Sequence, residues 1–542
     1  MEQVDEKIKN LKTSEDIISY IKQSTFNSPD MVYREIKVLN EIVYAVYNES
    51  VTSTDLISNF VIRSITLLEN NDKTQERLTT ISKELDKYID DELQINKSKM
   101  NKKQKIHDNL KKEIDTSGNS LNIKDIISNL NQKLDIRKVN KVDLNKDDIF
   151  YYLFSGFTCI IYNKDIVAVE TKATLDRSIS TPITENTIKG PKDAFTENYQ
   201  TNLGLVRKRL KSEKLVLEEE KVGRRSKTKV GLLYISDIVR MGLVDEVKSK
   251  LKKIDIDAIL DSNYIMEILE DSNKTSFPTM ISTERPDLVT LYLLQGRVAL
   301  IVENSPFILV LPAFMEDFIN NMDDYYQKDI DVTITKIIRY IALIITIFTP
   351  AIYISLITFN QEAIPTELLL SFVAQRKGVP FPAFFEAMLM IISFEILREG
   401  DYRVPNVAGS TLSIVGALIL GDAAVNAGIV SPIMIIVVAI TTISGLMFSD
   451  INMSNSLRIW RLIFLILAAL AGLIGVGVGT LLLITKISST TSFTKPYSYP
   501  ISPINFKSIK NSILKRQNIS QNTTRDEACT DNITKYKVKE ES

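Results

Sequence analysis

The chain has 542 residues with a formal net charge of −1, and 25% of its residues are charged. Since one domain usually takes roughly 100–200 residues, two or more domains are expected. The balanced charge argues against a nucleic-acid partner, which normally requires a strong basic excess.

Side chains that commonly hold metals or perform catalysis are scarce. The sequence contains two cysteines, Cys159 and Cys529, and one histidine, His107. The cysteines lie far apart, so neither a disulfide framework nor a cysteine-rich metal site is expected. His107 stands among Lys, Asn and Gln, where a solvated side chain is expected, and the sequence has neither a P-loop nor an HExxH motif. We therefore expect no enzyme, no cofactor and no metal site.

Residues 1–70 are expected to form an N-terminal α/β subdomain. The start of the chain lacks the apolar core of a signal peptide, so this half is expected to stay on the side of synthesis. Residues 36–47 carry β-branched and aromatic side chains that suit a strand, although the pattern also fits a helix.

Residues 71–146 are rich in Lys, Asn and Asp, and their apolar residues are widely spaced. This composition is well solvated and buries poorly. It predicts an insertion that is disordered or forms a solvated helical hairpin, and a basic arm that binds a partner is the alternative.

Residues 147–336 are expected to form a second, cytoplasmic α/β subdomain. Strand–turn–strand patterns at 157–169 and 298–311 predict two β-hairpins, which begin just after Gly156 and Gly296. Their likeness fits either an internal duplication or the general similarity of hairpins. Cys159 is expected to be buried in the first of them.

The stretch TPITENTIKGPKDAFTEN at 181–198 lies between the hairpins. Gly190 and Pro191 are typical of a helix start, with Asp193 in the first turn near the positive helix end. A helix is therefore predicted over residues 191–211, docked on the soluble domain by an apolar stripe. The stripe consists of Phe195, Tyr199, Leu203, Val206 and Leu210.

Residues 337–485 are expected to form a helical membrane domain. Residues 340–359 are free of charge and match the ~20 residues that cross a ~30 Å hydrocarbon core. Three further segments are long or apolar enough to cross or nearly cross, namely 410–430, 432–448 and 459–484. Segment 383–397 is short and carries two glutamates, so an amphipathic or re-entrant helix is expected there, which leaves four crossings.

Basic residues flank both ends of this region. By the positive-inside rule they place the N-terminal domain and the tail at 486–542 in the cytoplasm, which requires an even number of crossings. The tail is rich in Ser, Thr, Asn and Pro, and it is expected to be mostly unstructured. The predicted fold class is an α/β (α+β) N-terminal domain followed by an all-α transmembrane domain.

Four polar side chains in the apolar region are pore candidates, because such groups usually face water or a bundle interior. A symmetric homo-oligomer would turn one acid per chain into a collar that attracts cations. Structural roles are the alternative: Glu395 could pair with Arg398, and Asp422 could bond a neighbouring helix. The candidates are Glu386 and Asp422 as first choices, then Asn426 and Glu395.

The longest distinctive motif of the chain is RSISTPITENTIKGPKDAFTEN from Arg177, followed by NLGLVRKRLK at 202–211. This motif and several others closely resemble those of the A subunit of GerA-type spore germinant receptors. The resemblance covers about 150–516 and, more faintly, 28–70; the polar insertion and the end after Arg516 depart from it. The other matching motifs, in chain order, are GRVALIVENSPF at 296–307, DDYY at 323–326, VPFP at 379–382, EILRE at 395–399 and GALILGDAAV at 416–425.

This resemblance implies a multi-pass protein in the lipid of the spore inner membrane. Such subunits act with a permease-like B subunit and a lipoprotein C subunit to sense nutrients, and the A subunit is thought to form an oligomeric, ligand-gated cation channel. A scaffold that relays a partner's ligand state is the alternative. A secondary transporter fits less well, because so few spans leave little room for paired repeats.

The signature residues would lie at an interface between subunits in the relay alternative. Arg177 could bridge Glu185 or a neighbour's carboxylate, and Pro182 would stiffen the loop. The plain alternative is a structural turn that anchors the following helix. The signature residues are Arg177, Pro182, Glu185, Asn186, Gly190, Pro191, Phe195, Glu197, Asn202 and Arg207.

Overall fold

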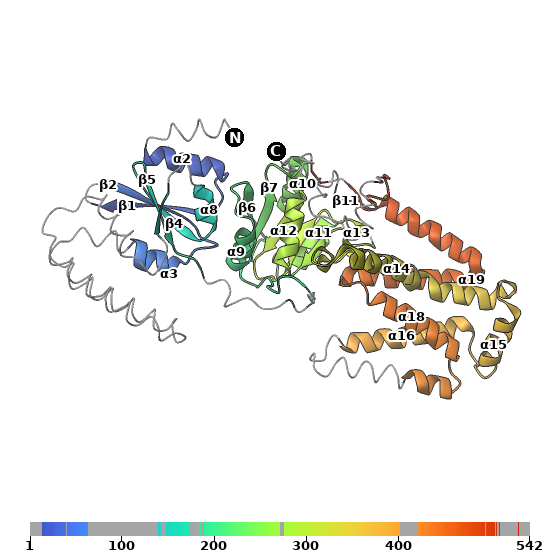
Figure 1. Ribbon diagram of the computed structural model, residues 1–542. Helices are drawn as coiled ribbons and strands as arrows, with labels where there is room; N and C mark the ends of the chain where they lie inside the picture. Colours follow the sequence, from blue (N-terminus) through green and yellow to red (C-terminus); the bar gives the residue numbers. More distant parts are fainter. Residues whose placement is uncertain are drawn as a thin grey trace, which may run out of the picture.

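The computed structural model describes residues 13–38, 41–62, 139–142, 148–173, 182, 184–185, 189–270, 276–401, 420–493, 495–504, 506, 509 and 529–530. Over this part of the chain, two α/β units are followed by a helical region (Figure 1). The predicted α/β N-terminal half and helical second half are therefore confirmed.

The first unit is a five-stranded antiparallel sheet covered by helices. Alternate residues of a strand face opposite sides: Tyr44 and Val46 pack against two helices, whereas Val43 and Ala45 face the other side with Val61. The strands, in sheet order, are β1 (Met31–Val38), β2 (Glu41–Asn48), β4 (Phe157–Tyr162), β5 (Asp165–Glu170) and β3 (Val139–Val142). The helices are α2 (Ser14–Ser24) and α8 (Ile149–Phe154) on the first face, and α3 (Thr54–Leu56) continuing into η1 (Ile57–Ile62) on the second.

The structure corrects three predictions for this unit. Residues 36–47 are not one strand, because β1 ends at Val38, β2 begins at Glu41 and the two strands pair antiparallel. The hairpin at 157–169 exists, but it joins β2 in the first sheet and not the second subdomain. Residues 139–142, assigned to the polar insertion, form the edge strand β3; the remainder of the insertion lies outside the described residues. No local pattern predicts pairings between strands so distant in sequence.

The second unit is another five-stranded antiparallel sheet between two pairs of helices. Leu233 and Ile301 face α9 and α12, whereas Leu232 and Leu300 face α10 and α11. In sheet order the strands are β6 (Leu215–Val222), β7 (Thr228–Ile235), β9 (Val298–Val302), β10 (Ile308–Leu311) and β8 (Ile281–Thr283). The helices are α9 (Tyr199–Arg209), α10 (Met241–Lys252), α11 (Ser262–Leu269) and α12 (Pro286–Leu294).

The two units share one topology. The order β1-β2-β4-β5-β3 in the first sheet is repeated as β6-β7-β9-β10-β8 in the second. The predicted hairpins occupy equivalent central places, and the glycines before them, Gly156 and Gly296, have φ of +85° and +89°. This shared order is what an internal duplication predicts, and hairpin similarity alone does not require it.

Helix α9 begins eight residues later than predicted. Asn198 accepts a hydrogen bond from the amide of Thr201 and caps the helix, so Gly190 and Pro191 lie in the irregular strip before it. Asp193 pairs with Arg209 near the far end of α9, at 2.5 Å, and does not lie in a first turn. The apolar stripe is nevertheless buried from Phe195 onward, as predicted.

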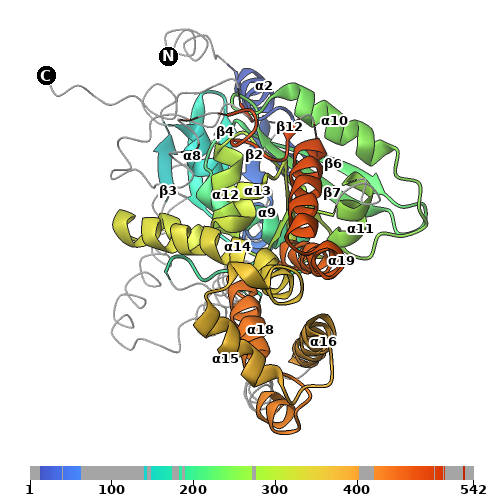
Figure 2. The ribbon, with the colours of Figure 1, turned by 90° about the vertical axis from the view of Figure 1, so that its right-hand side faces the viewer.

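The helical region extends away from the second unit (Figure 1). Two of its described helices are long and apolar enough to cross a membrane, Ile330–Thr358 and Ile451–Ser489. Viewed along the region, α15, α16 and α18 lie on one side of α14 and α19 (Figure 2). The helices are α14 (Asp329–Thr358), α15 (Thr366–Arg376), α16 (Ala383–Asp401), α18 (Pro432–Gly445) and α19 (Ile451–Ser489).

Several predicted boundaries in this region move. The first helix begins at Asp329, ahead of the expected domain start at 337. Helix α16 has 19 residues, so it is longer than the short helix expected at 383–397. The predicted segment 432–448 corresponds to α18, which has 14 residues. Of the predicted segment 410–430, residues 410–419 lie outside the described part.

The predicted single span at 459–484 is wrong, because α19 reverses direction within it. Gly472 has φ +57° and ψ −139°, a conformation essentially restricted to glycine. A Cβ on Gly475 would overlap the carbonyl of Leu467, and one on Gly479 would lie 3.0 Å from the ring of Phe464. Along a straight helix, residues 8 and 15 apart would be ~12 and ~22 Å apart, so the two halves of α19 form a tight antiparallel hairpin.

The start of the tail is ordered against the second unit, contrary to the expectation that it is mostly unstructured. Strands β11 (Thr491–Ser492) and β12 (Lys495–Pro496) pair with each other. Tyr497 is fully buried and stacks on Phe277, and the hydroxyl of Ser492 donates to the carbonyl of Thr279. Cys529 is also buried. Both ends of the helical region therefore meet the second unit.

Candidate functional site

We call residues 177–198 the signature strip. Its described residues lie beside the junction, by which we mean the contact region between the second unit and helices α14 and α19. Of its first residues, Arg177 and Asn186 lie outside the described part of the chain, so a bridge from Arg177 stays a prediction. Pro182 is buried. Glu185 accepts a hydrogen bond from the hydroxyl of Thr283 on β8 at 2.8 Å.

Gly190 and Pro191 carry the strip past the DDYY motif. Gly190 has φ +115°, and a Cβ there would lie 2.6 Å from the ring of Tyr326. A side chain at this position would therefore be strained and would displace Tyr326. Pro191 and Glu197 are exposed, whereas Phe195 enters the core of the second unit.

Asn202 fixes the end of the strip to helix α9. It is fully buried; its Oδ1 accepts from the amide of Thr196 at 2.7 Å, and its Nδ2 donates to the carbonyl of Thr196 at 2.5 Å. The same Nδ2 lies 3.5 Å from the carbonyl of Ser305, in the turn before β10. The side chain of Asn202 thus satisfies both backbone groups of Thr196, which does not belong to a strand.

Arg207 joins the two α/β units. Its side chain is fully buried, and its Nε donates to Asp30 of the first unit at 2.9 Å. The guanidinium also donates to Ser28 at 3.1 Å and to the carbonyl of Leu215 at 2.7 Å, and it lies 4.8 Å above the ring of Phe154. Several neighbours of the buried pair supply the hydrogen bonds that its desolvation requires.

A second buried ion network lies beside the strip. Arg285, at the start of α12, donates to both oxygens of Asp287 at 3.1 and 2.8 Å and to Asp323 at 3.2 Å. The hydroxyl of Tyr326 donates to Asp287 at 2.9 Å. Since Tyr326 also contacts Gly190, the network connects the strip to the DDYY motif.

The DDYY motif continues this connection into the helical region. Asp324 lies in the short helix η5 (Met322–Tyr325) and forms a two-point pair with Arg339 of α14, at 2.6 and 3.0 Å. Both side chains are largely buried. The strip therefore contacts Tyr326, and Tyr326, Asp287, η5 and α14 are joined by consecutive polar contacts.

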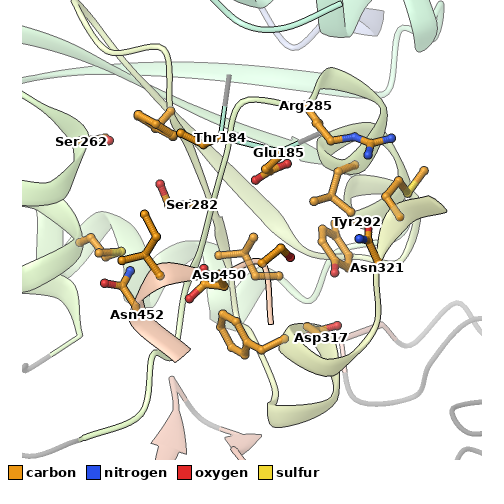
Figure 3. A pocket seen from close by; sticks show the side chains of 18 of the residues that line it. Thr184, Glu185, Ser262, Ser282, Arg285, Tyr292, Asp317, Asn321, Asp450 and Asn452 are labelled. Atoms are coloured by element: carbon orange, nitrogen blue, oxygen red, sulfur yellow. The ribbon is translucent and has the colours of Figure 1, made fainter. Parts of the chain in front are cut away.

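A cavity of about 490 Å³ lies at the junction (Figure 3). One wall comes from the second unit, including the short helix α13 (Met315–Ile319) and the loop after it. The opposite wall is residues 449–452, the end of the connection between α18 and α19 and the first residues of α19. Its polar lining includes Thr184, Glu185, Asp261, Ser262, Ser282, Arg285, Asp317, Asn320, Asn321, Asp450 and Asn452.

Two carboxylates in this cavity are shifted toward the neutral form. Burial raises the pKa of Glu185 from 4.5 to about 7; the Thr283 hydroxyl and nearby Arg285 oppose that rise, and Glu284 and Asp450 add to it. Burial also raises the pKa of Asp450, although the amide of Met453 at the start of α19 donates to it. Carboxylates with raised pKa values in a cavity are candidate functional groups.

We expect Glu185→Gln to stabilise the protein at pH 8 and to change little at pH 5. The folded state holds the Glu185 proton up to about pH 7, whereas the unfolded chain releases it near 4.5. Stability therefore falls as pH rises through this window, by on the order of 3 kcal/mol, and the glutamine removes that loss. Thermal unfolding of the purified chain at both pH values measures the difference. Glu267→Gln, on the exposed face of α11, is the matched control, and equal behaviour of the two variants would refute the assignment.

The first-choice pore residue Glu386 is neutralised within the chain. It is 1% exposed, and its Oε1 accepts from Arg376 of α15 at 3.0 Å. Its Oε2 accepts from the amide and hydroxyl of Ser431 at 2.9 and 2.8 Å. This arrangement connects α15 and α16 to the start of α18.

The other three candidates divide into one paired residue and two exposed ones. Glu395 pairs with Arg398, the structural alternative, and also with Arg458 and Arg461 at 3.0 and 2.9 Å. Asp422 and Asn426 are exposed, and no ion pair or hydrogen bond of their side chains is found within the described residues. The structure brings Glu395 to the arginines of α19 and leaves Asp422 and Asn426 facing outward together.

Several residues of the junction do not stand out in the sequence. Arg285 and Asp287 are among them, although Arg-Pro-Asp before an apolar run is a recognisable helix start. Asp450 precedes a long apolar helix, a position typical of an N-cap. Their meeting at one site is not predictable from sequence, because it depends on how α12, η5 and α19 pack.

Comparison with protein families gives a match over most of the chain. The family described as "Bacillus/Clostridium GerA spore germination protein" matches residues 19–528. The chain is 41% identical over 377 residues to spore germination protein KA of Bacillus subtilis (strain 168), which is 69% of this chain and 69% of that protein. It is 38% identical over 335 residues to spore germination protein A1 of the same organism, covering 62% of this chain and 69% of the relative.

One similar solved structure is the N-terminal domain of the A subunit of the Bacillus megaterium spore germinant receptor GerK3. The match has 29% sequence identity and a TM-score of 0.37, and it covers 56% of this chain and 95% of that one. The family match over residues 19–528 includes both α/β units and the helical region. The chain belongs to the GerA family of spore germination proteins.

Proposed function

We propose that this chain is the A subunit of a nutrient germinant receptor and that its copies form a cation channel in the spore inner membrane. Family membership supports the role in germination, and the two long apolar helices support membrane association. A permease-like B subunit and a lipoprotein C subunit are the proposed partners.

In the proposed topology, the chain crosses the membrane an even number of times. Helix α14 leaves the second unit, and the reversal at Gly472 returns the end of α19 to it. The contact of Tyr497 with Phe277 supports this return, because both residues belong to the same buried core. The N-terminal units and the tail then share the cytoplasmic side, as the flanking basic residues suggest.

Asp422 is the best-supported pore residue in this proposal. It is exposed in the single chain, shares a helix face with Asn426, and has no ion-pair partner among the described residues. A ring of copies would bring one such carboxylate per chain to a common axis, where it attracts cations. Glu386 has Arg376 as its counter-ion, so it is assigned to packing.

Asp422→Asn is therefore expected to reduce the cation-over-anion selectivity of the reconstituted receptor several-fold, because the collar loses its charge. Currents across a bilayer that contains the full receptor, recorded on addition of nutrients, measure this selectivity. Glu362→Gln, an exposed acid between α14 and α15, is the matched control and should behave as wild type. Unchanged currents in Asp422→Asn would refute the collar.

A relay without a pore is the second candidate, and the contacts that run from the strip through Tyr326 to Arg339 favour it. Arg285, Asp287 and Tyr326 connect the strip to η5, and Asp324 connects η5 to α14. Such contacts could transmit a partner's ligand state to the membrane helices. In that case ions pass through another subunit, and Asp422→Asn leaves the currents unchanged.

A further inference from the structure

Within the described part of the chain, the cavity at the junction contains two carboxylates without a counter-ion and one buried acceptor that the protein leaves unsatisfied. Glu185 and Asp450 have no ion-pair partner among the described residues. The Oδ1 atom of Asn320 is shielded from solvent and accepts no hydrogen bond there. A buried acceptor without a donor and carboxylates without a counter-ion are both costly, so this lining favours a cationic ligand that donates hydrogen bonds.

The basic side chain that lines the cavity is already engaged. Arg285 directs its guanidinium to Asp287 and Asp323. The remaining aspartate near α13, Asp317, is neutralised by Arg297 at 2.7 Å. The net charge presented to the cavity is therefore negative, and an anionic ligand would meet no available partner.

The rest of the lining indicates an organic ligand. Met266, Ile281, Leu288, Phe318 and Met322 supply apolar contacts around the polar groups. Within the described residues, no group of three or more His, Cys, Asp or Glu could hold a metal ion. A volume of about 490 Å³ lies within the ~300–1,000 Å³ typical of small-molecule sites.

We propose that this cavity binds a small aliphatic amine, with one or two protonated amino groups held by Glu185 and Asp450. Glu185 belongs to the signature strip, whereas Asp450 caps the first residues of α19. The bound amine bridges the second unit and the membrane helices, so it stabilises this arrangement of the junction. Amine binding in this cavity does not require the membrane region to conduct ions.

The test is isothermal titration calorimetry of the full-length chain in detergent at pH 8, with 1,4-diaminobutane as the probe. Saturable binding of one molecule per chain is expected, and the neutral analogue 1,4-butanediol should not bind. Glu185→Gln and Asp450→Asn should each weaken binding at least tenfold. Asparagine is also a good N-cap, so the second variant keeps the start of α19. Glu267→Gln is the control with unchanged affinity.

A third variant addresses the cavity without altering its charge. Ser282→Phe places a ring in the space and should abolish binding while both carboxylates remain; Ser282 lines the cavity from β8. Size-exclusion chromatography checks that each variant is folded. The proposal is overturned if the wild-type chain shows no saturable binding, or if every folded variant binds the diamine as tightly as wild type.

Discussion

Arg207→Met should destabilise the contact between the two α/β units by about 3–5 kcal/mol, because it leaves the buried carboxylate of Asp30 without a counter-ion. Arg207 and Asp30 are 177 positions apart, and their side chains are 0% and 1% exposed. Burial raises the pKa of Asp30, but Arg207, Ser28 and Asn48 together hold it below its ordinary value. The substitution of Arg207 removes the largest of the interactions that lower the pKa of Asp30.

Hydrogen–deuterium exchange of the full-length chain measures this effect locally. Amides of α9 and of β1 should exchange about 10²- to 10³-fold faster in Arg207→Met, since each 1.4 kcal/mol corresponds to a factor of ten. Arg209→Met is the matched control on the same helix, because Arg209 and its partner Asp193 are 20% and 23% exposed. Partly exposed pairs contribute ~1 kcal/mol or less. Equal effects of the two substitutions would contradict the special role of the buried pair.

The double variant Arg207→Met with Asp30→Asn isolates the interaction. Asparagine keeps the size of the side chain and removes the uncompensated charge. Part of the lost protection should therefore return, and the two substitutions should be strongly non-additive. Additive losses would show that Arg207 acts through packing against Phe154 alone.

Gly472→Val should abolish the hairpin of α19. The substitution requires a β-branched residue at φ +57°, and the new Cβ would lie 2.7 Å from the Cβ of Phe359. The backbone conformation alone costs on the order of 1–3 kcal/mol, and the overlap adds to it. The end of α19 can then no longer return to the second unit, so the docking of residues 490–498 should be lost.

Hydrogen exchange across residues 489–500 and β8 reports this loss, because Ser492 donates to the carbonyl of Thr279 and Tyr497 is buried in the wild-type chain. Gly477→Val provides a close control. Gly477 lies in the same helix, and a Cβ added there would meet nothing within 4 Å, so only a helix-propensity change is expected. If the tail is equally protected in Gly472→Val and Gly477→Val, the reversal does not depend on Gly472.

The helical region shows why sequence patterns predict helices better than their directions. The apolar run at 459–484 is continuous, so periodicity alone indicates one long helix. The reversal depends on a single left-handed glycine and on the close approach of Gly475 and Gly479 to the preceding half. Such contacts appear only once the two halves are packed.

The polar pore candidates also include contacts that the sequence predicts and contacts that it does not. Glu395 and Arg398 are three residues apart on one helix, so their pairing is foreseeable from sequence. Glu386 and Ser431 are 45 residues apart, and no local rule connects them. The sequence therefore favours Glu386 as a pore residue, although its charge is compensated inside the chain.

The sequence by itself determined the local elements: the hairpins at 157–169 and 298–311, the apolar run at 340–359, the buried stripe from Phe195 and the motifs of the GerA family. Short-range periodicity, turn chemistry and charge specify these features within a few residues. Tertiary structure alone decided which sheet each hairpin joins, where α19 reverses, and that Glu185 and Asp450 face one cavity. These outcomes depend on contacts between residues far apart in the chain, and only the packing of the whole fold brings such residues together.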